Sequence, residues 1–582
     1  MRRQPWVSGV RHVAMAGILG LGVSPTMAQG QATVATQPAT LSAEDIQRIT
    51  DDFRREHAAE IAAGEQRVHE RIVADLVASA KEGKVFAVES LAGMKLPAEE
   101  GLPIFQGLLQ DSNVEIQRAA MEGIAGYGGR AAGLVPVLLP YLEKNVGDAA
   151  SANNLRFGAA RTLGAIGPEA RAAVVPLLAL VESADASDVT PYLRAVSIEA
   201  LGNMGPASAR ALEAIRPLQA SADTAIAYQA FVAVGKIENL PPMEPQRLAR
   251  DGVAAFNGDA GHRAFAAVRQ MPNAEAQQAL ADLLAANPAA SHQLLALELL
   301  KGLKPSEAAA LREVLGHLGA ADPLIAGAAE NAVRVARSTD VSAVAMLGEK
   351  MKDSNDKVGL HAAVLLAEFG EGGKPAIGSG VEALGRFSGK TVAYRIIATL
   401  RFLRERGTDA KEAVPGLLAM LQSDAPVMRG RQTYEVGTLR GSAMAALAAI
   451  GAPAEALPLI REALAHGGPA EFAAAARAAT HFPGERAMLV PPLIAGLEIA
   501  RYDREIDATD WVANVYTVMP GHEGTTARVE AIRALVSLGG AEAKGAIPQL
   551  RAVAGDARAT GGIYTRYRIK EEAEKAIEAL SR

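Results

Sequence analysis

One pattern recurs along this chain of 582 residues at an interval of 38, and it limits what the chain can fold into. Arg118 begins RAAMEGIAGYGG, Arg156 begins RFGAARTLGAIG and Arg194 begins RAVSIEALGNMG. In each copy one glycine stands eight residues after the arginine and a second stands eleven after it. Self-similarity at this period is typical of a solenoid, in which small units share a core with their neighbours.

The pattern extends through the rest of the chain with some alteration. The arginine-to-glycine interval of eleven returns at Arg440–Gly451 and Arg528–Gly539. Looser copies begin at His292, Val358, Arg395 and Phe472. A single hydrophobic core stops growing well below this chain length, so several domains or a repeat array are required, and the pattern favours the array.

Each unit predicts two helices joined by a tight turn. In Arg161–Val181, RTLGAIGPEARAAVVPLLALV, Gly167 suits the left-handed conformation that ends a helix, and Pro168 suits the start of the next. Apolar residues then follow at i, i+3, i+4 and i+7, namely Val174, Leu177, Leu178 and Val181. A further proline recurs seven to nine residues after the turn, at Pro136, Pro176, Pro415, Pro458 and Pro548. Because a proline inside a helix costs about 3 kcal/mol, it marks either a kink or the true start of the second helix.

These units predict an all-α fold, an α-solenoid of stacked antiparallel helix pairs. The pattern LGAIGPEARAAVVPLLALV resembles the HEAT-like repeats of the phycobilisome-lyase class, an α-solenoid family. The resemblance implies a HEAT/armadillo-like superhelix of about 14 helix pairs over residues 83–582. It implies little about function, because such repeats serve many unrelated roles.

The family resemblance also implies a ladder of charged residues between repeats. In HEAT repeats an aspartate in the turn and an arginine early in the second helix link neighbouring units. Asp111 with Arg118, and Asp188 with Arg194, match that pattern. Asp353 and Asp424 occupy similar turns with less regular partners, so we expect the ladder to be broken in the middle of the chain.

The first 28 residues have the features of a signal peptide. Three arginines precede or flank an apolar run, Val13–Val23, and Thr26-Met27-Ala28 supplies a small-x-small cleavage site. The run is too short to span a bilayer comfortably. We therefore expect cleavage after Ala28, a periplasmic or secreted location, and no membrane span in the mature chain. Residues 29–41 predict a polar linker.

Residues 42–82 depart from the repeat period. Ile46, Ile49, Phe53, Ile61, Val68, Ile72 and Leu76 follow helical spacing through a charged background. We interpret this segment as an N-terminal amphipathic helix that caps the first repeat. The alternative is self-association, in which the helix pairs with a second copy of the chain.

Composition excludes several classes of chemistry. The net charge is −6 with both signs scattered, which argues against a nucleic-acid partner. The absence of cysteine excludes disulfides, thiolate catalysis, cysteine-ligated zinc and covalent haem. The histidines have no metal-ligand spacing, and His522 has no nucleophile near it in the sequence. The acidic run DREIDATDW has Ala508 and Asn514 where a calcium loop needs glycine and glutamate. We therefore predict no catalytic residue, no metal and no cofactor.

The longer connections fall at equivalent places in the repeat. The insertions are residues 145–155, 182–192, 422–438, 498–525 and 555–564, each between a unit's first helix and its second, and none at a Gly-Pro turn. In a solenoid equivalent positions stack, so these insertions should line one edge, as binding loops often do. They contain the residue types that anchor interfaces, and the candidate partner-binding residues are Tyr192, Arg429, Arg431, Tyr434, Trp511, Tyr516, Tyr564 and Arg566.

These features lead to one hypothesis and two alternatives. The hypothesis is an exported, non-catalytic HEAT-repeat scaffold that binds a protein partner through its curved surface and this loop-rich edge. The family resemblance implies the first alternative, a lyase or accessory factor for a tetrapyrrole or other cofactor. The second alternative is binding of envelope glycans by the tyrosine and tryptophan rings of the edge.

Overall fold

A computed structural model describes residues 58–143, 149–184, 189–258, 260–336, 342–422, 433–498, 526–555 and 563–582. At 58–65, 149–154, 433–438 and 563–568 it describes the backbone alone. The chain divides into two compact units, Met1–Pro241 and Pro242–Arg582. All the regular secondary structure of the described residues is helical, which confirms the predicted all-α class.

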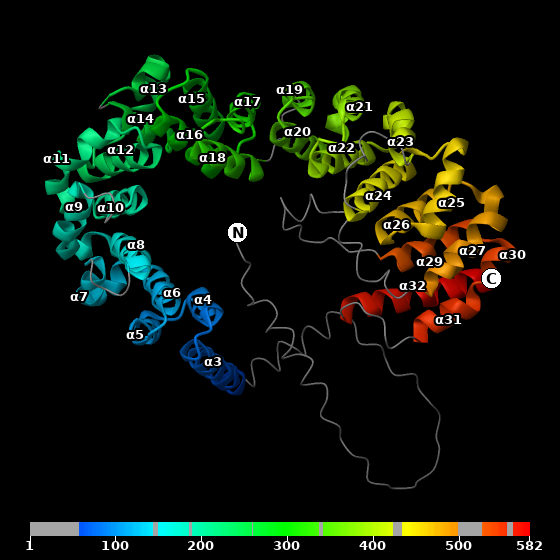
Figure 1. The fold of residues 1–582 in the computed structure, drawn as a ribbon, viewed down its shortest axis with the longest axis horizontal. Helices are drawn as coiled ribbons and strands as arrows, with labels where there is room; N and C mark the ends of the chain where they lie inside the picture. The colour runs from blue at the N-terminus through cyan, green and yellow to red at the C-terminus, as the bar shows by residue number, and fades with distance from the viewer. Residues whose placement is uncertain are drawn as a thin grey trace, which may run out of the picture. The chain divides into compact units, whose positions relative to one another are not determined.

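The first unit consists of two layers of helices (Figure 1). The inner layer is formed by α4 (Val85–Met94), α6 (Val114–Ala125), α8 (Ala149–Ile166), α10 (Pro191–Asn203) and α12 (Thr224–Glu238), each packed on the next. The outer layer is formed by α3 (Ala58–Lys81), α5 (Ala98–Leu108), η1–α7–η2 (Gly128–Leu134, Val135–Leu138, Leu139–Leu142), η3–α9 (Gly167–Ala173, Val174–Glu182) and η4–α11–η5 (Gly205–Ala211, Leu212–Ile215, Arg216–Ala220). Inner and outer helices alternate along the chain, as a stack of antiparallel pairs requires.

The second unit repeats this arrangement. Its inner helices are α14 (Ala260–Val268), α16 (Ala290–Leu303), α18 (Pro323–Arg334), α20 (Asp356–Glu368), α22 (Ala393–Glu405), α24 (Thr433–Ile450), α26 (Pro469–Ala479), α29 (Ala527–Leu538) and α32 (Ile563–Ser581). Its outer segments are α13–η6 (Pro245–Asp251, Gly252–Phe256), α15 (Asn273–Ala285), α17 (Ala308–His317), α19 (Ser342–Met351), η7–α21 (Gly370–Ala376, Ile377–Arg386), η8–α23 (Gly407–Ala413, Val414–Leu421), η10–α25 (Ala454–Ala456, Leu457–His466), η11–α27 (Pro483–Glu485, Arg486–Leu497) and α30–α31 (Gly540–Lys544, Ile547–Gly555). The looser copies of the sequence pattern coincide with inner helices α16, α20, α22 and α26.

After α6, α8, α10, α20, α22, α24 and α29, the turn to the next outer segment uses a glycine with positive φ. Gly167 has φ 82° and Gly205 has φ 59°, the conformation predicted for the second glycine of the pattern. In the first copy Gly128, at φ 55°, takes this role instead of Gly129, which is the second glycine there. The turn in that repeat is therefore shifted by one residue.

The recurrent proline marks the start of the outer α-helix. After the glycine the chain forms a short 3₁₀ segment, and the α-helix then begins beside the proline. Pro136, Pro415 and Pro458 occupy the first turn of α7, α23 and α25, where a missing amide hydrogen costs nothing. The structure thus decides between the two predicted roles of this proline in favour of a helix start.

The first glycine of the pattern permits close approach of adjacent inner helices. A Cβ built on Gly164 of α8 would lie 2.7 Å from Ala200 Cα of α10, and one on Gly202 would lie 2.7 Å from Ala233 Cα of α12. Both distances are shorter than van der Waals contact. Any side chain at these positions would force the helix backbones apart.

Residues 155–182 are long and apolar enough to cross a membrane by length and composition. Half of this window is buried inside the fold, and it contains the turn at Gly167 that separates α8 from η3. Its apolar character follows from burial between neighbouring repeats, because both layers of the pair are apolar on their shared faces.

Candidate interaction surface

Tyr192 is the one predicted partner-binding residue whose side chain the structure describes. It lies at the beginning of α10 with 64% of its surface exposed. Its ring stacks on that of Phe157 from α8, with the centroids 4.7 Å apart and the planes 13° from parallel. The two rings form an aromatic pair between adjacent inner helices, and Tyr192 is presented to solvent.

Local sequence holds Tyr192 in this position. The Thr190 side chain accepts a hydrogen bond from the Leu193 amide at 3.2 Å, which caps the helix. Pro191 occupies the first helical position, where its fixed φ suits the start of a helix. The tyrosine is therefore held in the first turn of α10, at the end of the insertion 182–192.

The other predicted residues are only partly placed. Tyr434 lies in the first turn of α24, and Tyr564 and Arg566 lie at the start of α32, where the structure describes the backbone alone. Like Tyr192, these three residues are at the start of an inner helix. Arg429, Arg431, Trp511 and Tyr516 lie outside the described residues.

The predicted insertions share one position in the order of helices. Each follows an outer segment and precedes an inner helix, namely α8, α10, α24, α29 or α32. The glycine turns lie at the opposite ends of the inner helices that have them, because α6, α8, α10, α20, α22, α24 and α29 each run from an insertion or short loop toward a glycine with positive φ. Within each unit, the two kinds of connection therefore occupy opposite edges.

Arginines bind the ends of outer helices on the insertion edge. Arg156 Nε donates to the Leu142 carbonyl at 3.1 Å, at the end of η2. Arg194 donates to the Ser183 carbonyl after α9, and Arg440 to the Leu421 carbonyl at the end of α23. These three residues occupy the arginine position of the repeat pattern. Each supplies a cation to carbonyl groups that have no partner within the helix.

This arrangement differs from the aspartate–arginine ladder that the family resemblance implies, although one link of that kind joins α22 to α20, where Arg395 donates to Asp356 at 2.9 Å. The Asp111 carboxylate accepts from the Asn113 amide at 2.8 Å, within its own turn. Arg118 instead pairs with Glu115 and Glu122 of its own helix, at 3.0 Å and 2.9 Å. The expected Asp111–Arg118 link is therefore wrong, because carboxylates one turn away on α6 bind the guanidinium first. Asp188 and Asp424 lie outside the described residues.

A second set of contacts joins inner helices of the second unit through ion pairs. Arg440 of α24 binds Glu471 of α26 at 2.7 Å, and Arg477 of α26 binds Glu530 of α29 at 3.1 Å. Arg533 of α29 binds Glu572 of α32 at 2.6 Å. Glu471 and Glu530 are buried, so each of these bonds pairs a carboxylate that would otherwise be desolvated alone.

The described residues contain no cluster of three histidine, aspartate or glutamate side chains that could hold a metal ion. His361 is buried inside α20, and His481 after α26 bonds the Ala448 carbonyl at 2.8 Å, so both take part in packing. His522 and the acidic run DREIDATDW lie outside the described residues. Among the charged groups that act on His361, Lys357 lies on the same helix, whereas Glu330 and Arg334 come from α18 and could not be identified from the sequence.

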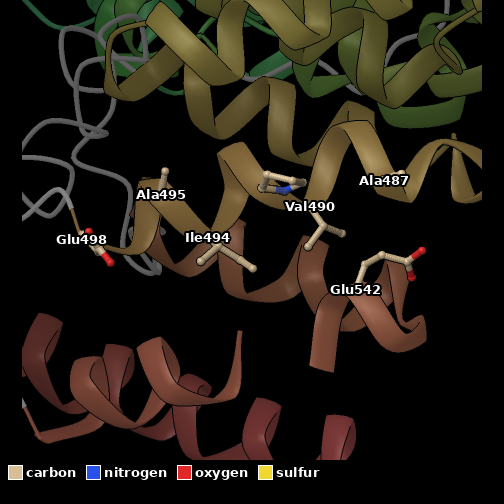
Figure 2. Close-up of a pocket in the computed structure, with 7 residues that line it drawn as sticks. Ala487, Val490, Ile494, Ala495, Glu498 and Glu542 are labelled. Carbon is tan, nitrogen blue, oxygen red and sulfur yellow. The ribbon is translucent and has the colours of Figure 1, made fainter. Parts of the chain in front are cut away.

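An open groove of about 480 Å³ lies beside α27 (Figure 2). Val490 and Ile494 of α27 supply much of its apolar lining, and Glu542 comes from α30. Figure 2 shows Glu498 and Glu542 at opposite ends of the groove. A groove with two separated carboxylates and an apolar floor offers no pair of groups placed for proton transfer.

No protein-family model and no curated protein matches the chain. Among solved structures it is similar to the karyopherin Kap121p bound to the SUMO protease Ulp1p, at 12% identity and a TM-score of 0.41, covering 88% of this chain and 56% of that one. It is similar to a chain from a study of the phosphorylation switch between cadherin and beta-catenin, at 14% identity and a TM-score of 0.35, covering 82% and 100%. A chain of a homology model of the full-length AP-3 complex gives 10% identity and a TM-score of 0.30, covering 86% of this chain and 94% of that one. This chain spans about half the length of the karyopherin that it matches.

Proposed function

We propose that the protein is an exported, non-catalytic scaffold that binds a protein partner on the insertion edge of its first unit. The observation that carries this proposal is the exposed Tyr192 ring, held against Phe157 at the start of an inner helix. Tyrosine is enriched among the residues that dominate binding energy at protein interfaces. A ring that is already fixed in place loses little side-chain freedom on binding, which favours affinity.

The same geometry shows that Tyr192 does little for the fold. Most of its surface faces solvent, and the helix start is already fixed by Thr190 and Pro191. Its replacement should therefore leave the helix stack intact. Such a residue can be removed to test binding without unfolding the repeat.

Photo-cross-linking tests the proposal in the intact protein. A photoreactive phenylalanine analogue placed at Tyr192 should give a discrete adduct with a protein in the native host. The matched control is the same analogue at Val175 of α9, an apolar residue that is 55% exposed but lies in the outer layer, and it should give no such adduct.

A variant completes this test. Tyr192→Ala should weaken binding of the partner identified by cross-linking about tenfold or more, which is the effect typical of an interface anchor. Unchanged capture, or equal adducts at Tyr192 and Val175, would count against the insertion edge as the binding surface. An adduct with a polysaccharide instead of a protein would support glycan binding and overturn the protein-partner proposal.

Export is tested separately. We expect the protein isolated from its host to begin at Gln29, because the signal peptide is removed after Ala28. Mass spectrometry of the N-terminal peptide from separated envelope and cytoplasmic fractions measures this. A chain recovered from the cytoplasm with its first 28 residues intact would contradict export and leave the binding proposal unaffected.

A further inference from the structure

The sequence contains one Asn-Gly pair, Asn257-Gly258, and both residues are exposed in the turn between η6 and α14. Gly258 has φ 57°, and among the described residues nothing beyond its chain neighbours lies within 4 Å of the position that a Cβ would take. An asparagine followed by glycine is prone to react with the next peptide group, because glycine has no side chain to keep its amide nitrogen away from the asparagine side chain. The turn leaves room for this reaction.

The hydrogen bonds of the turn hold its two flanks and omit the reacting groups. The Asn257 amide donates to the Ala254 carbonyl at 3.3 Å, and the Gly258 carbonyl accepts from the Gly261 amide at 3.0 Å. Within the part of the chain that the structure describes, the peptide group between Asn257 and Gly258 and the Asn257 side chain form no hydrogen bond. This peptide group can therefore rotate toward the side chain without the loss of a native bond.

We propose that Asn257 is a modification site, at which the chain deamidates without an enzyme. The Gly258 amide nitrogen loses its proton to solvent base and attacks Asn257 Cγ. The bond that forms closes a five-membered succinimide, and the side-chain nitrogen leaves as ammonia after it takes a proton from water. Water then adds to one of the two ring carbonyls, and opening of the ring gives aspartate or isoaspartate. One water is consumed and one ammonia is released.

A nearby pair shows how the fold selects the site. Asp251-Gly252 can form the same ring by loss of water, and it stands only six residues earlier in the chain. The Gly252 amide, however, donates to the Leu248 carbonyl at the end of α13 (Pro245–Asp251). The Asp251 carboxylate pairs with Arg247 of the same helix at 3.2 Å. Because both reacting groups are already bonded, we expect Asp251 to remain unchanged in the folded protein.

Isoaspartate at position 257 would alter the packing of α14. Its main chain runs through the β-carbon, so one additional methylene enters the backbone between Phe256 and α14. Phe256 is 1% exposed, and its ring packs on that of Phe265 in α14, with the centroids 4.8 Å apart. The connection is thus anchored at both ends. A longer connection between these anchors weakens the first turn of α14, and either product adds one negative charge.

Peptide mapping of the full-length protein, incubated at pH 7 and at pH 8, measures the reaction. Trypsin releases residues 251–263 as one peptide that contains both pairs, and electron-transfer fragmentation locates isoaspartate within it. Asn257 should convert, about tenfold faster at pH 8, because only the deprotonated amide nitrogen attacks and its fraction rises tenfold per pH unit. The synthetic peptide 251–263 is the unfolded reference, and it should form isoaspartate at both positions.

The outcomes of this experiment are distinct. Conversion of Asn257 in the folded protein at a rate comparable to that in the free peptide, with Asp251 unchanged, supports the proposal. The proposal is overturned if Asn257 stays intact in the fold while the free peptide converts. Isomerisation of Asp251 in the fold as fast as in the free peptide would overturn the selection by hydrogen bonding.

Two variants separate the chemistry from its structural effect. Asn257→Gln should fold and remain unmodified, because its longer side chain would have to close a six-membered ring. Freshly prepared Asn257→Asp has the added charge with an ordinary backbone. In hydrogen–deuterium exchange, the isoaspartate form, separated by anion exchange, should lose protection in α14 (Ala260–Val268), and Asn257→Asp should not. Equal protection of the two forms would contradict the effect of the longer backbone.

Discussion

A Gly164→Val variant is expected to lose about 3 kcal/mol or more of stability in the repeats around α8 and α10. The Cβ of valine would lie 2.7 Å from Ala200 Cα and 2.9 Å from Ala200 Cβ. Overpacking of a core is commonly relieved by side-chain movement, but here the obstructing atom belongs to a helix backbone. The two inner helices must therefore separate, and the contacts along both of them weaken.

Thermal denaturation together with hydrogen–deuterium exchange over residues 149–203 would measure this loss and locate it. The matched control is Gly107→Val in α5, where nothing lies within 4 Å of the added Cβ and the position is exposed. Surface substitutions of that kind stay within about 0.5 kcal/mol. Equal stability of the two variants would show that α8 and α10 do not approach each other as described.

Arg440→Met is expected to cost about 3–5 kcal/mol, whereas Glu471→Gln is expected to cost little. Arg440 and Glu471 have only 12% and 7% of their side-chain surfaces exposed, and Arg440 also binds the Leu421 carbonyl. Removal of the arginine leaves a buried carboxylate without its partner. Glu471→Gln removes the carboxylate charge, but Arg440 keeps its hydrogen bond to the Leu421 carbonyl.

The pKa of Glu471 supports this asymmetry. Burial raises the pKa of its carboxyl above the usual range, although Arg440 lowers it. Because the pKa of Glu471 is raised in the fold, its protonated form stabilises the protein at pH values below the unfolded-state pKa. This stabilisation is lost as the pH rises through the folded-state pKa. The penalty of Arg440→Met should therefore shrink as the pH is lowered.

Urea denaturation of the two single variants and of Arg440→Met/Glu471→Gln, at neutral and mildly acidic pH, tests both statements. The double variant should recover most of the stability that Arg440→Met loses, because the unpaired carboxylate is gone. A double variant as unstable as Arg440→Met would assign the loss to the Leu421 carbonyl instead of to Glu471.

The fold followed from the sequence because its signals are local. A glycine that ends a helix and a proline that starts the next act within a few residues, so the repeats, the turn at Gly167 and the helix starts at Pro136 and Pro415 could be predicted. The role of Gly164 could not be predicted, because it depends on the close approach of the Ala200 backbone on another helix.

Contacts between repeats were predicted less well. Arg118 was assigned Asp111 as its partner but pairs with glutamates of its own helix. Arg156 and Arg194 bind backbone carbonyls, which every residue carries and no sequence pattern reveals. The partners of Arg440 and Arg477 lie 31 and 53 residues away, so no fixed interval links these pairs. For the candidate surface, the insertions and Tyr192 were visible in the sequence, whereas the stacking of Tyr192 on Phe157 depends on how α8 and α10 pack.

The arginine-to-carbonyl bonds have a consequence for how such a chain can diversify. The same bond closes spans of 14, 11 and 19 residues, from Leu142 to Arg156, from Ser183 to Arg194 and from Leu421 to Arg440. Since each bond ties helix end to helix start directly, the intervening sequence can change in length and content without altering the helix register. Sequence changes and inserted peptides are therefore tolerated on that side, whereas a change in length at a glycine turn would displace the positive-φ glycine that ends the inner helix.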